Sequence, residues 1–198
     1  MLYKAKTKIL FSDYWIDHLV YKPHSDYDLA GHVDAIAIKS ESGSVYDFYR
    51  SGRVEEPKNF KYTKLYNHFS ELQRLVDAFK VEKTRVRIHK QNPGNIIPDH
   101  VDDNNIYAKK PEDVRLRIIT ALNDNDDAIY RFNDRVISLR KGESVVFEPD
   151  KVKHGMENNS KDTARYALVQ IVKVYPFSEW FKDFLYKDNM IDTRWHSR

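Results

Sequence analysis

Residues 115–147 read RLRIITALNDNDDAIYRFNDRVISLRKGESVVF, and this stretch decides the fold. Runs rich in β-branched and aromatic residues alternate in it with short clusters of Asn, Asp and Gly, which is typical of strands joined by tight turns. No helical pattern lies between the runs, so the strands are expected to form an antiparallel barrel or sandwich and not a βαβ sheet. The turns are predicted at Asn123–Asp127, Asn133-Asp134 and Lys141-Gly142.

The same pattern extends outward on both sides of this stretch. A turn at Asn92–Asn95 follows an earlier strand, and a long apolar run begins at Arg165. The region from about residue 84 to 175 is therefore expected to form a β core. Its predicted strands are Thr84–Lys90, Arg115–Leu122, Ala128–Phe132, Val136–Arg140, Ser144–Glu148 and Arg165–Tyr175.

The flanking segments are expected to support this core. Short β-branched runs predict strands at Ile9–Phe11, Val33–Ile38 and Val45–Tyr49. Apolar residues recur at spacings of four and three between Lys61 and Lys80, which predicts an amphipathic helix over 61–80. Near the end of the chain, Ser178 as N-cap and Glu179 in the first turn predict a second helix over 177–187.

Length and composition limit the class of protein. With 198 residues, the chain has the size of one domain, so residues 1–198 are taken as a single unit. The net charge of +3 is small and no basic block stands out, so nucleic-acid binding is not indicated. Cysteine is absent, which excludes disulfides and thiolate metal sites. Any metal must therefore be bound by histidine and carboxylate side chains.

No targeting segment is apparent in the sequence. The apolar run near the start, Ile9–Phe11, is too short for the core of a signal peptide, and no stretch approaches the roughly 18 apolar residues of a membrane span. We therefore expect a soluble cytoplasmic protein without a membrane partner. The tryptophans near the end, Trp180 and Trp195, are assigned to packing or to a homodimer contact.

The chemistry-bearing motif is His100-x-Asp102. In a strand, residues two apart point to the same face, so the two side chains can bind one ion. His154 follows a predicted loop after a distant strand and is the candidate third ligand. Two imidazoles and one carboxylate can cover one face of an octahedral Fe(II) and leave positions open for a co-substrate and O₂. The alternative is that Asp102 merely forms a turn.

Arg165 lies at the start of a run apolar enough to be a core strand. A buried guanidinium needs a partner, because an unpaired buried charge is costly. The carboxylate of a bound molecule would match the guanidinium fork with two parallel hydrogen bonds. An internal salt bridge to Asp or Glu is the other interpretation.

Three further residues are candidates for substrate binding. Alternation places Arg87 and His89 on one face of their strand, where they either line the barrel and meet an acidic group or face water. Tyr107 lies in a long polar connection, residues 103–113, which is either a lid beside the site or a solvated loop.

Taken in order, these motifs resemble a known family. The elements are Asn92-Pro93-Gly94, Ile97-Pro98-x-His100-x-Asp102, Arg115-Leu116-Arg117, Gly142-Glu143-x-Val145-Val146-Phe147 and His154 with Arg165 eleven residues later. Their combined spacing resembles the Fe(II)/2-oxoglutarate-dependent oxygenases, and within them the aspartyl/asparaginyl β-hydroxylase group, which includes free-proline hydroxylases. The resemblance implies a double-stranded β-helix, the jelly-roll or cupin-like fold.

The resemblance also implies roles for individual residues. His100, Asp102 and His154 would bind Fe(II), Arg165 would hold the distal carboxylate of 2-oxoglutarate, and Arg117 would reach the other end of this co-substrate. The implied reaction uses O₂, converts 2-oxoglutarate to succinate and CO₂, and hydroxylates an amino acid, either free or within a peptide or protein.

Two other classes of function stay open at this point. A metal-binding cupin isomerase or lyase would need the metal ligands but not Arg165, and a non-catalytic binding module would bind iron without forming succinate. The substrate itself is not specified by the sequence.

Overall fold

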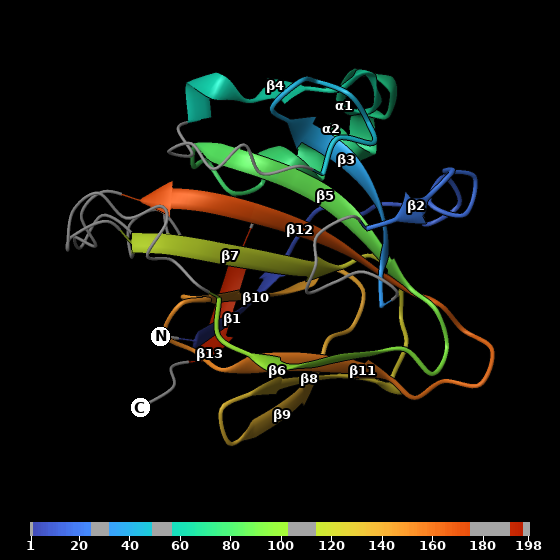
Figure 1. The fold of residues 1–198 in the computed structure, drawn as a ribbon, viewed down its shortest axis with the longest axis vertical. Helices are drawn as coiled ribbons and strands as arrows, with labels where there is room; N and C mark the ends of the chain where they lie inside the picture. Colours follow the sequence, from blue (N-terminus) through green and yellow to red (C-terminus); the bar gives the residue numbers. More distant parts are fainter. Residues whose placement is uncertain (1, 25–31, 49–56, 103–113, 175–190, 196–198) are drawn as a thin grey trace.

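The computed structural model describes residues 2–24, 32–48, 57–102, 114–174 and 191–195. Within them the chain forms two antiparallel sheets that face each other, with two short helices outside the larger sheet (Figure 1). This arrangement confirms the predicted mainly β, double-stranded β-helix core with flanking helices. The predicted helix over 177–187 lies outside the described residues.

The larger sheet follows the order β13-β1-β10-β7-β12-β5-β3-β2, with β4 paired to β3. Its central strands β5, β7 and β12 make the most extensive antiparallel pairings in the fold. The strands are β1 (Leu2–Thr7), β2 (Lys22–Pro23), β3 (Asp34–Ser40), β4 (Lys61–Tyr62), β5 (Lys83–Gln91), β7 (Val114–Ala121), β10 (Glu143–Phe147), β12 (Arg165–Val174) and β13 (Ile191–Trp195).

The smaller sheet follows the order β6-β11-β8-β9. It comprises β6 (Ile96–His100), β8 (Ala128–Phe132), β9 (Arg135–Ser138) and β11 (His154–Asn158). In Figure 1 this sheet lies below the larger one, and the space between the two sheets is the interior of the β-helix.

Turns between the strands form at the predicted turn residues. Asn133 has a φ of 52° between β8 and β9, and Gly142 has a φ of +80° before β10. Asn tolerates this left-handed region and Gly enters it without steric penalty, which explains the choice of residues at both turns.

Alternation along the central strands separates two cores. Inward-facing apolar residues, among them Ile119, Phe132 and Val169, fill the space between the sheets. The outward-facing Ile88 and Leu168 pack instead against the helices. Burying one such side chain contributes about 1.5–3 kcal/mol, so both faces of the central strands stabilise the fold.

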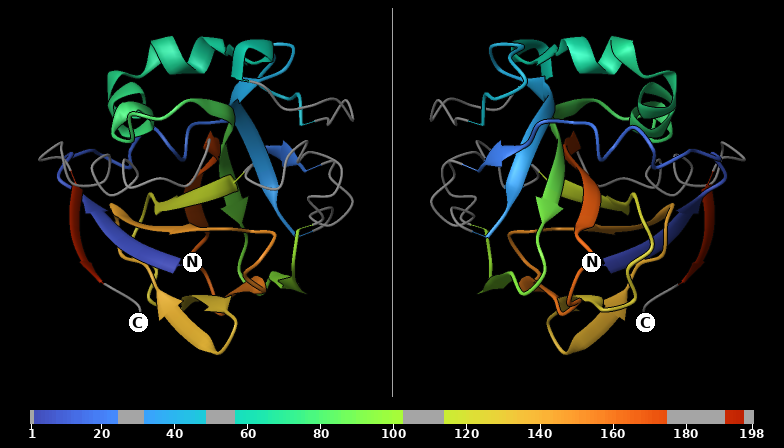
Figure 2. Two further views of the ribbon diagram at one scale, coloured as in Figure 1. Left: turned by 90° about the vertical axis from the view of Figure 1, so that its left-hand side faces the viewer. Right: turned by 90° about the vertical axis from the view of Figure 1, so that its right-hand side faces the viewer.

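The helical region differs from the single helix predicted over 61–80. The chain forms a short 3₁₀ turn, η1 (Pro57–Asn59), the strand β4, and then α1 (Lys64–His68) and α2 (Ser70–Asp77). Phe69 separates the helices because its backbone is extended, and its ring stacks on Trp15 with 5.4 Å between the centroids. The predicted apolar stripe is present on α2, whose buried residues pack with residues of the larger sheet. The helices lie outside that sheet (Figure 2).

Two of the strands predicted near the start are wrong. Residues 9–11 follow β1 as irregular chain, and Leu10 is 89% exposed. Residues 45–48 form a turn and irregular chain, although Phe48 is buried against Ala35 and Ala37. Ile9, Phe11 and Val45 still pack against the core without forming strands, so apolar composition alone is misleading here.

Candidate active site

His100 and His154 lie directly opposite each other in the smaller sheet. His100 is the last residue of β6 and His154 the first of β11, and the two are paired in the register of these strands. The ring centroids are 4.3 Å apart. Strand pairing therefore brings together two imidazoles that are far apart in the sequence.

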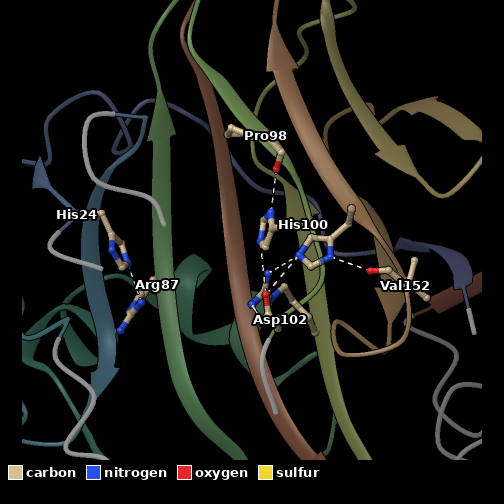
Figure 3. A network of polar contacts seen from close by, with 8 residues as sticks. His24, Arg87, Pro98, His100, Asp102 and Val152 are labelled. Atoms are coloured by element: carbon tan, nitrogen blue, oxygen red, sulfur yellow. Dashed lines mark hydrogen bonds and ion pairs between the residues drawn. The ribbon is translucent and has the colours of Figure 1, made fainter. Parts of the chain in front are cut away.

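The main chain orients both rings in the same way. Nδ1 of His100 donates to the carbonyl oxygen of Pro98 at 2.8 Å, and Nδ1 of His154 donates to that of Val152 at 2.9 Å (Figure 3). A carbonyl oxygen only accepts, so each neutral ring carries its proton on Nδ1 and has its lone pair on Nε2. This is the arrangement in which a backbone group fixes the tautomer of a metal-binding histidine.

Asp102 supplies the third donor, but not from the strand. β6 ends at His100, so the expectation that strand alternation places the two side chains on one face is wrong. Asp102 is held instead by its backbone N–H, which donates to the carbonyl oxygen of Pro149 at 2.9 Å. Its Oδ1 lies 3.4 Å from Nε2 of His100 and 3.7 Å from Nε2 of His154.

Arg117 on β7 contacts the triad from the larger sheet. Its guanidinium donates to Oδ2 of Asp102 and, at 3.0 Å, to Nε2 of His154. Both acceptors thus point toward a single cationic group. The contact places Arg117 beside the three candidate metal ligands.

The electrostatic environment favours the metal-binding forms of two of the three ligands. Burial alone would raise the pKa of Asp102, but Arg117 and the two histidines hold it far below its usual range, so this carboxylate is charged. Burial and Arg117 lower the pKa of His154 to about 3, so its ring is neutral. The pKa of His100 is raised, chiefly by its hydrogen bond with Asp102.

The three donors fit an Fe(II) ion. One ligand atom from each of His100, Asp102 and His154 can be chosen so that all lie within 4.8 Å of one another. Two imidazole nitrogens and one carboxylate oxygen are the donor set of non-haem Fe(II) oxygenases. The neutral ring of His154 and the charged carboxylate of Asp102 meet the requirement that ligands be deprotonated.

Arg165 points into the same interior from β12 and is 4% exposed. Its Nε donates to the hydroxyl of Tyr130 at 2.7 Å, and its Nη2 contacts the same oxygen. The alternative of an internal salt bridge is not observed, since among the described residues its polar partner is this neutral phenol. Tyr130 comes from β8 of the smaller sheet and is not singled out by the sequence, although the alternation in Ala128–Phe132 places it on the same face as Phe132.

Arg87 and His89 face the interior and not the solvent. Both line the cavity that is also lined by His100, His154 and Arg165. Arg87 contacts Nε2 of His24 at 2.6 Å and donates to the carbonyl of Phe48 at 2.9 Å (Figure 3). The sequence assigns His24 no role. Tyr107 lies outside the described residues.

Apolar side chains complete the wall of the cavity. They come from both sheets and would exclude water from the polar groups between them. The wall includes Ile97, Ile119, Phe132, Met156, Val169 and Ile171.

The fold and the site together define a double-stranded β-helix protein with a triad of two histidines and one carboxylate. A model of the aspartyl/asparaginyl β-hydroxylase family matches residues 36–174. The chain belongs to this family and is thereby an enzyme of the 2-oxoglutarate-dependent oxygenase class.

Several solved structures are similar in fold. An oxidoreductase of the 2OG-Fe(II) oxygenase family from Burkholderia pseudomallei is 16% identical, with 80% of this chain and 76% of that one covered and a TM-score of 0.49. The non-haem α-ketoglutarate-dependent epimerase SnoN from nogalamycin biosynthesis is 10% identical, with 87% and 77% covered and a TM-score of 0.49.

A protein of unknown function from Streptococcus pyogenes is 18% identical over 46% of this chain, with a TM-score of 0.33, and the chain spans 64% of its length. The assignment of the chain to the aspartyl/asparaginyl β-hydroxylase family therefore rests on the family model and not on these structures. A search of curated proteins finds no match. Among the described residues, no helix is long and apolar enough to cross a membrane.

Proposed function

We propose that the protein, as one oxygenase domain, is an Fe(II)- and 2-oxoglutarate-dependent dioxygenase that hydroxylates an amino acid. The observation that carries the proposal is the convergence of His100, Asp102 and His154 in a cavity that Arg165 and Arg117 also enter. Metal donors and two arginines in one apolar-walled interior are what a 2-oxo dicarboxylic acid bound to a metal requires.

His100, Asp102 and His154 would hold the Fe(II) ion. With 2-oxoglutarate and O₂ bound, the metal would supply the oxidative chemistry that hydroxylates a C–H bond while the co-substrate becomes succinate and CO₂. The protein itself would position the metal and the co-substrate and shield them from water. Asp102 would offset one charge of the metal, and the backbone bonds of the two imidazoles would hold their Nε2 atoms toward it.

The two arginines would bind the two ends of the co-substrate. Arg165 lies on β12 and would pair with the distal carboxylate. Arg117 already contacts Asp102 and His154, so it is placed to bind the carboxylate next to the keto group. A guanidinium is always charged and binds a carboxylate through parallel hydrogen bonds, which suits both tasks.

The substrate is proposed to be an amino-acid residue in a peptide or protein, with a free amino acid as the second possibility. The name of the family supports the first. Arg87 lines the cavity and is held by His24 and Phe48, so it is the described residue best placed to meet an acidic group of the substrate. Tyr107 is retained as a substrate residue on sequence grounds alone.

The test is anaerobic titration of the protein with Fe(II) and then 2-oxoglutarate, following the metal-to-ligand charge-transfer band. The wild-type protein is expected to develop the band, and His100→Ala and His154→Ala are expected to lose it. His68→Ala, an exposed histidine on α1, is the matched control and should behave as wild type.

Succinate release then distinguishes the possible reactions. Release stimulated by peptides, and not by free amino acids, supports the protein-residue substrate, and the reverse supports the free amino acid. Unchanged turnover in Arg165→Ala, or turnover without 2-oxoglutarate, would instead identify a cupin isomerase or lyase and refute the proposal.

A further inference from the structure

A second cavity lies beside the start of β5, away from the candidate active site. Its volume is about 480 Å³, and it shares no lining residue with the cavity that His100 and His154 line. Two of its lysines are buried, since Lys39 is 8% exposed and Lys83 is 4% exposed. Lysine is almost never this buried unless it is paired. The charged residues of the lining are Lys39, Lys58, Asp77, Lys80, Glu82 and Lys83.

Irregular strand pairing accompanies both buried lysines. The register of β3 with β5 shifts between Ala37 and Lys39, and that of β12 with β5 shifts between Gln170 and Val172, where Val172 pairs with Lys83. An irregularity of this kind re-aims a side chain from one face of a sheet to another direction. The two lysines thus reach one cavity from neighbouring strands.

The two side chains are hydrogen-bonded to main-chain carbonyl groups. Nζ of Lys39 donates to the carbonyl oxygen of Lys83 at 2.6 Å, and Nζ of Lys83 donates to that of Phe79. An ammonium has three N–H donors and no acceptor. Carbonyl oxygens are neutral, so these contacts do not compensate two buried positive charges that repel each other. The loss of one charge, or an anion between the two groups, would relieve this repulsion.

Lys83 is the group that loses its charge more easily. Burial lowers the pKa of Lys83 to about 8; Asp77 opposes this effect, and the charge on Lys39 adds to it. This value lies in the range of an α-amino group. At pH 8 about half of the Lys83 side chains are therefore neutral, against about one in 300 for a lysine of ordinary pKa.

The surroundings of Lys39 favour its charged form. Burial lowers the pKa of Lys39, but Glu82 acts in the opposite direction. Its Nζ also lies 4.9 Å from the centroid of the Tyr62 ring, and an aromatic face attracts a cation. The pair therefore consists of a nucleophilic amine, Lys83, and a cation beside it, Lys39.

We propose that Lys83 reacts reversibly with CO₂ to form a carbamate, and that Lys39 binds this new anion. The lone pair of Nζ forms a bond to the carbon of CO₂, one C=O electron pair moves onto oxygen, and the nitrogen releases one proton to water. Nothing is oxidised or reduced. The cavity has room for several molecules of the size of water, so CO₂ can reach the amine.

The product fits the contacts that the two lysines already make. A carbamate nitrogen keeps one hydrogen, which can still be donated to the carbonyl oxygen of Phe79. Its two oxygens can accept the remaining N–H groups of Lys39, so attraction between opposite charges replaces repulsion between like ones. The reaction needs only dissolved CO₂ and is independent of the proposed function, in which CO₂ is a product.

The experiment traps the carbamate in the full-length protein at about pH 8. The protein is equilibrated with isotopically labelled bicarbonate and treated with triethyloxonium ion, which ethylates carbamates and makes them stable. Peptide mass spectrometry then gives the labelled fraction at each lysine. Lys83 should be labelled at least about tenfold more than Lys64, an exposed lysine on α1, because its neutral fraction is larger.

Variants test the role of Lys39. Lys39→Met keeps much of the length of the side chain and removes the charge, and it should lower labelling of Lys83 about tenfold, as for the loss of one charge-assisted hydrogen bond. Lys39→Arg retains the charge and should preserve most of the label. Lys64→Met is the matched control and should leave labelling of Lys83 unchanged. Circular dichroism establishes that each variant is folded.

Two results would overturn the proposal. Labelling of Lys83 no greater than that of Lys64 in the wild-type protein would refute the carbamate without any need for a variant. Full labelling of Lys83 in folded Lys39→Met would refute the part assigned to Lys39. Both measurements are made without iron or 2-oxoglutarate, so their outcome is separate from that of the charge-transfer titration.

Discussion

At the residue scale, Gly155 occupies a position that admits no side chain. It directly follows His154 in β11, and a Cβ at this position would lie 2.2 Å from Oδ1 of Asp99 and 3.0 Å from the carbonyl oxygen of Ile97. Asp99 cannot easily move aside, because Nε of Arg131 donates to the same oxygen at 2.7 Å. The close approach of β6 and β11 beside His100 and His154 thus depends on glycine.

Gly155→Ala is therefore expected to destabilise the protein by about 2–3 kcal/mol, since overpacking against backbone forces the strands apart. The measurement is urea denaturation followed by circular dichroism. Gly94→Ala is the comparison, because Gly94 has a φ of +77° but a Cβ there would meet no atom within 4 Å. It should cost only about 1–2 kcal/mol of backbone strain. A Gly155→Ala protein as stable as wild type would contradict the close contact.

At the element scale, α2 is held by one apolar face. Leu72 is fully buried between the helix and the larger sheet, whereas Gln73, one residue later, is exposed. Leu72→Ala is expected to lower the free energy of unfolding by about 2–5 kcal/mol, and Gln73→Ala to change it by less than about 0.5 kcal/mol. Chemical denaturation measures both. Equal effects of the two substitutions would show that α2 does not pack as described.

Lys83 at the start of β5 makes the free energy of unfolding depend on pH in the alkaline range. Its ammonium donates to the carbonyl of Phe79, just after α2, and is 4% exposed. Burial lowers its pKa from 10.5 to about 8. Between these values the unfolded chain binds more protons than the folded one, so the Lys83 contribution to stability rises with pH across this window and is lost as pH falls through about 8.

The expected size of this dependence is on the order of 3 kcal/mol between pH 8 and 10.5. Denaturation of wild type and Lys83→Met at a series of pH values measures it, because Met cannot titrate and every other group is common to both proteins. The unfolding free energy of wild type should increase relative to that of Lys83→Met as pH rises. A constant difference would refute the lowered pKa.

The sequence predicts the elements better than the contacts between them. The bounds of β5, β7, β8, β10 and β12 agree with expectation to within one residue at each end, because alternation of interior and exterior side chains marks a strand directly. The break at Phe69 is not predicted, since it depends on the distant Trp15. His100 and Asp102 are both singled out by the sequence, but the end of β6 between them depends on a backbone bond to Pro149.

At the scale of the whole molecule, the site joins the two sheets. His100 and His154 belong to the smaller sheet, whereas Arg117 and Arg165 belong to the larger one. No local sequence pattern predicts that these four residues lie together, because their proximity depends on how the two sheets face each other. The sequence predicts the candidate ligands from their spacing and the family resemblance, whereas the pairing of Arg165 with Tyr130 is found only in the folded chain.

Ligand binding is therefore expected to stabilise the entire fold. With a divalent metal at about 100 times its dissociation constant, the free energy of unfolding should rise by about 2.7 kcal/mol, which corresponds to an increase in Tm of roughly 5–10 °C. Differential scanning calorimetry with Mn(II), which tolerates air, measures the shift, and adding 2-oxoglutarate should increase it further. An identical shift in His154→Ala would mean that the metal binds elsewhere.

The two hydrogen bonds from His100 to Pro98 and from His154 to Val152 follow one rule, in which each ring is held by the carbonyl two residues earlier in its own chain. Side chains can be exchanged without altering such a carbonyl, whereas a carboxylate or amide in its place would be lost by a single substitution. Side chains in the wall of the cavity can consequently change, in evolution or by design, while the course of the backbone preserves the orientation of the two histidine rings.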